Sequence, residues 1–225
     1  ELFKLAIGGY GLMGMIYSVT LRLARRQKVR RVVKVIKLEE FLPAIEKRVK
    51  DGFTYGDFQY DIDEKSDTFM RRGVFSCYQP VVDDVPVPET QKDLGHEDWL
   101  KLILLAYVDR KKVFDAYADY YLSTSGQTYW SDTHQMSVYI DEYRKFIDEK
   151  MGRKTPSSLM ISELYAPREK LTEFMNGARE ILRNRGTLVI YGTIRLIEKD
   201  DETFLPWARE RYACVILNLL VEHTE

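Results

Sequence analysis

The sequence predicts an α+β protein in which an antiparallel sheet carries helices packed on one of its faces. Segments with strand-like alternation and segments with helical spacing follow one another, but they do not alternate strictly as they would around a parallel sheet. The order strand–helix–strand–strand in residues 30–78 recurs in residues 158–221, with a helical insertion between the two. This order of elements indicates a weak internal symmetry.

The composition excludes several classes of partner. The 225 residues include 34 basic and 35 acidic side chains, which gives a formal net charge of −1. A balanced surface of this kind offers no general attraction for nucleic acid or for an anionic membrane. No apolar run approaches the length of about 20 residues that a membrane-spanning helix needs. We therefore expect a cytoplasmic protein with no nucleic-acid partner and no membrane span.

The chain offers no metal-ligand spacing. Cys77 and Cys214 lie far apart within strand-like segments, which favours buried free thiols, although a disulfide between them stays open. The paired carboxylates Asp83–Asp84 and Asp200–Asp201 are adjacent in sequence, so their side chains diverge. We expect solvated turns or helix caps at both pairs and no metal site.

The first half of the predicted sheet surrounds one helix. Residues 32–38 have the pattern of a strand, and residues 39–50 place their apolar side chains on one helical face. Acidic residues begin this helix and basic residues end it, as the helix dipole favours. Residues 58–62 and 72–78 are predicted to form a hairpin, followed by an irregular connection over residues 79–95 that contains three prolines.

The middle of the chain is mostly helical. Residues 96–122 have helical spacing, with a break near Asp109. Residues 127–143 are aromatic and polar, and residues 141–151 are predicted to form a short helix that Gly152 ends.

The last third repeats the pattern of the first. Residues 159–165 are predicted to form a strand, and residues 167–185 a helix that begins at a proline and ends before a glycine. Residues 188–197 and 212–221 are predicted strands, and residues 200–209 a short helix between them.

A glycine motif, Gly9-x-Gly11-x-x-Gly14, stands near the start of the chain. In a dinucleotide-binding Rossmann fold such glycines open a helix whose N-terminus receives a pyrophosphate. Residues 17–23 alternate apolar and polar side chains instead, which predicts that the glycines lead into a strand. The Rossmann interpretation stays open, with residues 32–36 as its second strand and Glu39 as the acid that binds the ribose.

Residues 8–16, followed by residues 19–23, resemble the end of the FAD-binding domain of the vanillyl-alcohol oxidase / PCMH-type flavoprotein superfamily. The resemblance implies an FAD cofactor against the glycine turn. It also implies that residues 1–28 are the C-terminal remnant of the FAD-binding domain, that residues 29–225 form a substrate or cap domain, and that an upstream segment with the pyrophosphate loop is missing. The cofactor-binding residues it implies are Gly9, Gly11, Gly14, Ile16 and, at the end of the final strand, His223.

Residues 162–169 and 191–197 resemble the cap domain of the sugar-alcohol and aldonolactone oxidase-like branch of the same superfamily. In these relatives the second of the two strands carries an acid and an arginine, two residues apart, over the flavin. The corresponding positions here are Thr193 and Arg195, so the arginine is kept and the acid is not. The resemblance implies oxidation of an alcohol, polyol or lactone by hydride transfer to flavin.

Four side chains are the candidate catalytic residues. A guanidinium at Arg195 suits developing negative charge, and Tyr191 and Thr193 share its face by the two-residue period of a strand. An ion pair of Arg195 with Glu198 or Asp200 is the structural alternative. His134, in the aromatic segment, is a candidate general base.

The function itself has an alternative. The chain could be a non-catalytic α+β module that binds a ligand or a protein. In that case the aromatic segment of residues 129–143 would form a partner surface.

Overall fold

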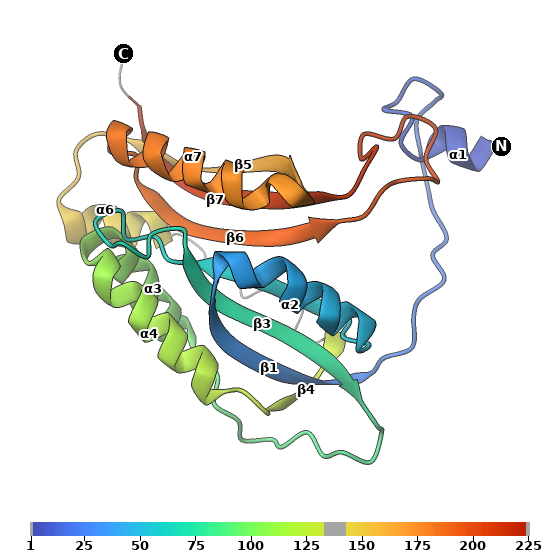
Figure 1. Cartoon of the computed structure of the whole chain (residues 1–225), viewed down its shortest axis with the longest axis horizontal. Helices are drawn as coiled ribbons and strands as arrows, with labels where there is room; N and C mark the ends of the chain where they lie inside the picture. The colour runs from blue at the N-terminus through green and yellow to red at the C-terminus, as the bar shows by residue number, and fades with distance from the viewer. Residues whose placement is uncertain (1, 133–142, 224–225) are drawn as a thin grey trace.

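A computed structural model of the chain describes residues 2–132 and 143–223, and these residues build one antiparallel sheet with helices on it (Figure 1). The sheet has seven strands in the spatial order β4-β1-β3-β2-β6-β7-β5. Each pair of neighbouring strands is antiparallel. The strands are β1 (Lys28–Lys37), β2 (Tyr55–Tyr60), β3 (Arg72–Val81), β4 (Thr128–Trp130), β5 (Ser157–Pro167), β6 (Val189–Ile197) and β7 (Tyr212–Glu222). The predicted α+β class with an antiparallel sheet is confirmed.

The sheet consists of two similar halves. The first is β1, helix α2 (Leu38–Lys50), β2 and β3, and the second is β5, helix α7 (Leu171–Arg185), β6 and β7. Their spatial orders, β1-β3-β2 and β5-β7-β6, correspond strand for strand. The internal symmetry that the sequence indicates is therefore present, and the two halves meet where β2 pairs with β6.

Helices α2 and α7 lie on the same face of the sheet, each across its own half (Figure 1). Phe41 and Ile45 of α2 and Leu171 and Met175 of α7 enter one core with Phe58. The face that α2 and α7 cover is called the helix face below, and the opposite one the open face. The short 3₁₀ helix η1 (Arg168–Lys170) leads into α7.

The expectation that helices pack on one face only is wrong for the insertion between the halves. Helices α3 (His96–Val108) and α4 (Arg110–Ser123) form a hairpin that breaks at Asp109, as predicted. Phe114 and Ala118 of α4 pack against Val33 and Val74, which alternate with residues of the helix face and so belong to the open face. The insertion therefore covers the β1 and β3 side of the open face. Helix α6 (Tyr143–Met151) follows the undescribed residues.

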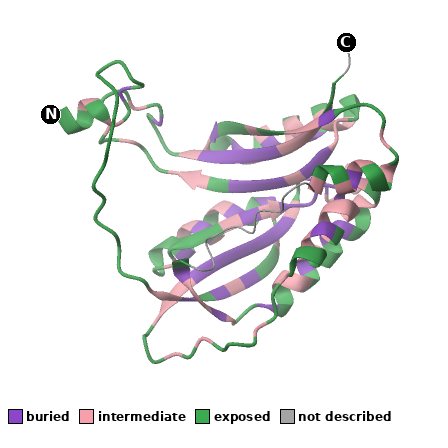
Figure 2. Cartoon of the chain, turned by 180° about the vertical axis from the view of Figure 1, so that it is seen from behind, coloured by how far each residue is buried: buried purple, intermediate pink, exposed green. Residues whose placement is uncertain are grey.

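Two predicted elements do not form. Residues 17–23 have no regular structure and lie exposed between helix α1 (Leu2–Ala6) and β1, as Figure 2 shows, because no described strand pairs with them. Residues 200–209 are an irregular loop. Pro206 lies in the middle of this segment, where it removes a helical hydrogen bond and clashes with the preceding turn.

Both cysteines are buried and free, so the favoured thiol prediction is confirmed. Among the residues that the structure describes, no helix has the length and apolar character needed to cross a bilayer. The strands that the structure describes all lie within residues 28–222, and residues 2–27 add none.

The contact between the two halves, called the seam below, is short. β2 and β6 pair at two positions, Phe58 with Ile194 and Gln59 with Thr193. The ring of Tyr60 reaches across β6 over Gly192, and its hydroxyl donates a hydrogen bond of 2.7 Å to the Ile216 carbonyl oxygen in β7. A side chain at position 192 would clash with the buried Tyr60 ring, so the seam requires glycine there.

Replacing this glycine tests the packing of the seam. We expect Gly192→Ala to destabilise the chain by about 1–3 kcal/mol, the usual cost of overpacking a core. Gly177→Ala is the matched control, because a methyl group there meets no atom within 4 Å on helix α7. It should stabilise the chain by about 0.5–1 kcal/mol. Urea unfolding measures both changes, and a Gly192→Ala chain as stable as the unsubstituted one would contradict this packing.

Candidate functional site

The candidate site lies on the open face at the seam. Asp57 on β2 and Tyr191 and Thr193 on β6 all face this side of the sheet, as the register between the strands requires. The Thr193 hydroxyl lies 3.0 Å from Asp57 Oδ2 and 3.2 Å from the Phe58 carbonyl oxygen. The seam therefore fixes one carboxylate against the second half of the sheet.

The Asp57 carboxyl group is electrostatically unusual. Burial raises its pKa above the ordinary value, while the hydrogen bond from Thr193 and the guanidinium groups of Arg195 and Arg31 act in the opposite direction. A carboxylate that is desolvated but close to cations can accept a proton from a ligand more readily than an exposed one.

Tyrosines from two elements surround this carboxyl group. Tyr117 and Tyr121 on α4 have ring centroids 4.3 Å apart, and Tyr191 interacts electrostatically with both and with Asp57. Burial raises the pKa of all three phenols, that of Tyr121 to about 12. The phenols therefore stay protonated at neutral pH and can donate hydrogen bonds to a ligand.

Arg31 closes the side of the site formed by the first half. Its guanidinium is buried, donates to the Tyr78 hydroxyl at 3.0 Å and to Thr124 Oγ1 at 2.7 Å, and lies 4.8 Å from the centre of the Tyr121 ring. Because α4, β1 and β3 all hold this side chain, its charge is fixed in place.

Arg195 lies on the same face of β6, but its side chain is exposed. The alternative to a catalytic role of Arg195 is an ion pair with Glu198 or Asp200. Glu198 binds Arg168 at 2.6 Å and Arg211 at 3.2 Å instead, and Asp200 accepts hydrogen bonds from the Thr203 backbone and hydroxyl. Within the described part of the chain, Arg195 makes no ion pair, so its guanidinium is available to a ligand.

Next to Arg195 an aromatic platform continues the open face onto β5 and β7. The Trp207 ring lies 4.5 Å from the Tyr165 ring and 6.2 Å from the Tyr212 ring. Tyr165 donates a hydrogen bond of 2.6 Å to Glu163, which raises the Tyr165 pKa to about 12. Tyr165 and Trp207 remain 40% and 47% exposed, so they offer apolar area beside the charged group.

The glycine motif forms a loop at this end of the sheet. Gly11 and Gly14 have positive φ angles, and a Cβ at either position would meet no atom within 4 Å. Gly9 differs, because a side chain there would clash with the Leu5 carbonyl oxygen, so its role is to turn the chain tightly after α1. The backbone at Gly11 and Gly14 is therefore open to a bound molecule, which fits the implied FAD contact.

The loop is attached to the segment that carries Trp207. The Phe204 amide donates to the Lys4 carbonyl oxygen at 3.1 Å, and a Cβ on Gly8 would lie 2.6 Å from Thr203 Cβ. Ile16, which follows the loop, is 61% exposed. The glycine loop and the aromatic platform thus lie at the same end of the second half.

The structure brings together some of the predicted residues and separates others. Tyr191, Thr193 and Arg195 share the open face as expected from the strand period. His223 lies at the opposite end of β7 from the glycine loop, where its Nε2 is 2.8 Å from Ser158 Oγ. His134 lies outside the described residues.

Sequence reasoning missed the acid of the site. Asp57 precedes the strand that the alternation predicts over residues 58–62, and β2 begins earlier, at Tyr55. Tyr117 and Tyr121 belong to a helix that was predicted without any link to the site. The alternation of β2 extends backward to Asp57, so this residue could have been assigned to the strand from the sequence. No local pattern in the sequence indicates that β2 pairs with β6.

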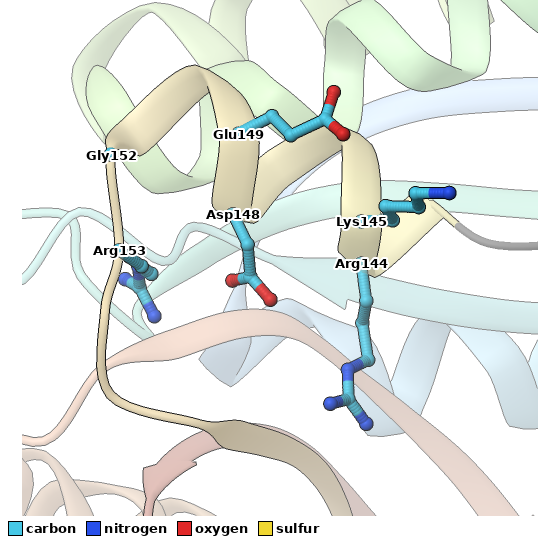
Figure 3. Close-up of a pocket in the computed structure, with 6 residues that line it drawn as sticks. All are labelled: Arg144, Lys145, Asp148, Glu149, Gly152 and Arg153. Carbon is cyan, nitrogen blue, oxygen red and sulfur yellow. The ribbon is translucent and has the colours of Figure 1, made fainter.

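Two surface depressions lie elsewhere. One of about 670 Å³ surrounds α6 and is lined by Arg144, Lys145, Asp148, Glu149, Gly152 and Arg153. In Figure 3 Arg144, Asp148 and Arg153 point to one side of this helix, and Lys145 and Glu149 point to another. Charges of both signs that do not converge make a poor binding site, so we place the functional site at the seam.

A scan against models of protein families found no match to the chain, and a search of curated proteins found none either. Within the residues that the structure describes, no group of three or more His, Cys, Asp or Glu side chains could hold a metal ion.

The raised Asp57 pKa predicts a pH-dependent effect on stability. The folded chain holds the proton more tightly than the unfolded chain, whose aspartates have a pKa of about 3.9. The resulting stabilisation is complete below that pH and is lost as the pH rises through the folded pKa. Asp57→Asn keeps the shape and has no charge to desolvate, so its stability relative to the unsubstituted chain should increase from about pH 3.5 to pH 7.

Urea unfolding at several pH values measures this difference. Asp84→Asn, in the exposed connection after β3, is the control for removing a carboxylate elsewhere. A relative stability of the Asp57→Asn chain that falls over the same pH range would contradict the burial of this carboxyl group.

Proposed function

We propose that the chain is the substrate-binding part of an FAD-dependent oxidoreductase that oxidises a hydroxylated small molecule, such as an alcohol, a polyol or a lactone. The observation that carries the proposal is the position of Asp57 and Arg195 on one open face at the seam. We propose FAD as the cofactor because the glycine loop resembles the end of a PCMH-type FAD-binding domain.

Asp57 and Arg195 have different roles at the substrate hydroxyl group. Asp57 is positioned to take the hydroxyl proton, because a carboxyl group with a raised pKa is closer to the pH at which it must work. Arg195 stabilises the negative charge that develops on the oxygen as the proton leaves. The acid that relatives carry at position 193 is thus replaced by Asp57 from the neighbouring strand, which Thr193 holds by a hydrogen bond.

The remaining residues orient the substrate. The protonated phenols of Tyr121 and Tyr191 donate hydrogen bonds to further hydroxyl groups. Tyr165 and Trp207 give apolar area for the carbon skeleton and exclude water from that side. Substrate selection would therefore depend on both halves of the sheet.

FAD, when bound, would supply the hydride acceptor. Gly11, Gly14 and Ile16 are the residues of this chain that would contact it, since their backbone is open and Ile16 is exposed. We propose that the pyrophosphate is held by a segment encoded upstream of Glu1. The chain expressed by itself should then bind FAD poorly.

The test uses the protein encoded by the complete open reading frame. We expect flavin absorbance in the purified protein and bleaching of the flavin by a member of a panel of alcohols, polyols, lactones and 2-hydroxy acids. Arg195→Met should slow bleaching about 10²–10³-fold, and Asp57→Asn about 10²–10⁴-fold. Arg185→Met, at the end of α7 on the helix face, is the control and should leave the rate unchanged.

Two results would contradict the proposal. A purified protein without flavin by absorbance and mass spectrometry would favour a non-catalytic binding module. A flavoprotein whose bleaching is insensitive to both Asp57→Asn and Arg195→Met would place its active site elsewhere.

A further inference from the structure

Strand β5 leaves a long edge of the sheet unpaired. Its eleven residues pair with β7 on one side, and β5 is the last strand in the sheet order. The exposed side chains along it are mainly apolar: Ile161 is 68% exposed and Met160 is 54% exposed, with Leu164 and Tyr165 also exposed. Glu163 is the one charged residue of the strand.

The internal symmetry shows how different this edge is from its counterpart. β1 occupies the equivalent position in the first half, and β4 pairs with its outer edge from Lys28 to Arg30. β1 also carries five basic residues: Lys28, Arg30, Arg31, Lys34 and Lys37. Proteins protect edge strands from pairing by covering them, charging them with lysine or bending them with a bulge. β1 has the first two protections, whereas β5 has no covering strand among the described residues, no lysine and no bulge in its pairing with β7.

We propose that β5 pairs in antiparallel orientation with β5 of a second copy of this chain, so that two sheets join into one. A strand edge in antiparallel orientation is complementary to itself, which satisfies the backbone groups of both copies at once. A two-fold axis through Ser162 places Met160 opposite Leu164 of the second copy. It places Glu163 opposite Ile161 of the second copy, so the two Glu163 carboxylates do not face each other directly.

The second copy is the occupant that the described strands favour. β4 is the strand at the other end of the sheet, and its three residues are too few to match the eleven of β5. Pairing through β5 also leaves the seam free, because β6 and β7 separate β5 from Asp57. The assembly is therefore independent of the proposed function and compatible with it.

Analytical ultracentrifugation of the chain, and of the protein from the complete reading frame, tests the assembly. We expect a monomer–dimer equilibrium in both. Met160→Lys combined with Leu164→Lys should raise the dissociation constant about tenfold or more, since the axis places these two positions opposite each other and the introduced like charges oppose pairing. Val49→Lys, at an exposed position of α2, is the control and should not change it.

Cysteine cross-linking tests the register. Ser162→Cys should form a disulfide-linked dimer under mild oxidation, because the axis brings the two positions together, and Ser158→Cys should not. Cys77 and Cys214 are buried and leave the test unaffected. Circular dichroism confirms that each variant is folded. A chain that is monomeric at every concentration, a dimer that the β5 lysines do not weaken, or equal cross-linking at the two positions would overturn the proposal.

Discussion

The packing of Tyr60 over Gly192 is the constraint on which the rest of the structure depends. Two residue pairs are a small contact for two halves of a seven-stranded sheet. The Tyr60 ring extends this contact, because it passes over β6 and its hydroxyl bonds to the backbone of β7. One aromatic side chain thus links three strands, and the absence of a side chain at position 192 is what permits it.

The same seam places the candidate site. Asp57 comes immediately before the paired residues of β2, and its partner Thr193 is one of the paired residues of β6. The first half therefore contributes the acid, and the second half contributes Arg195 and the aromatic platform. Helix α4, which covers the open face of the first half, adds the buried phenols of Tyr117 and Tyr121. Neither half contains the full set, so the site exists because the halves are joined in this register.

Much of the fold could be predicted because it depends on local periodicity. The alternation in β3, β6 and β7 and the helical spacing in α2 and α7 are properties of short segments, and the order of these segments revealed the internal symmetry. Residues 17–23 show the limit of this reasoning, since an alternating segment becomes a strand only when it pairs with another strand, and no described strand pairs with this one. Residues 200–209 show another limit, because Pro206 prevents the helix that their composition favours.

The site was predicted only in part for the same physical reason. Tyr191, Thr193 and Arg195 share a face through the two-residue period of one strand, which the sequence contains. Asp57 lies 136 residues away from Thr193, and only the pairing of β2 with β6 brings the two together. That pairing depends on the Tyr60 and Gly192 contact, which leaves no periodic pattern in either segment.

Carboxyl ¹³C NMR titration of Asp57 tests most directly the claim that the seam unites Asp57 and Arg195 in one site. We expect an Asp57 pKa above the ordinary value of about 3.9, and a further rise in an Arg195→Met chain because a nearby cation has been removed. The Arg185→Met chain should titrate as the unsubstituted one does. An Asp57 pKa at or below the ordinary value, or one that does not respond to Arg195→Met, would contradict the account.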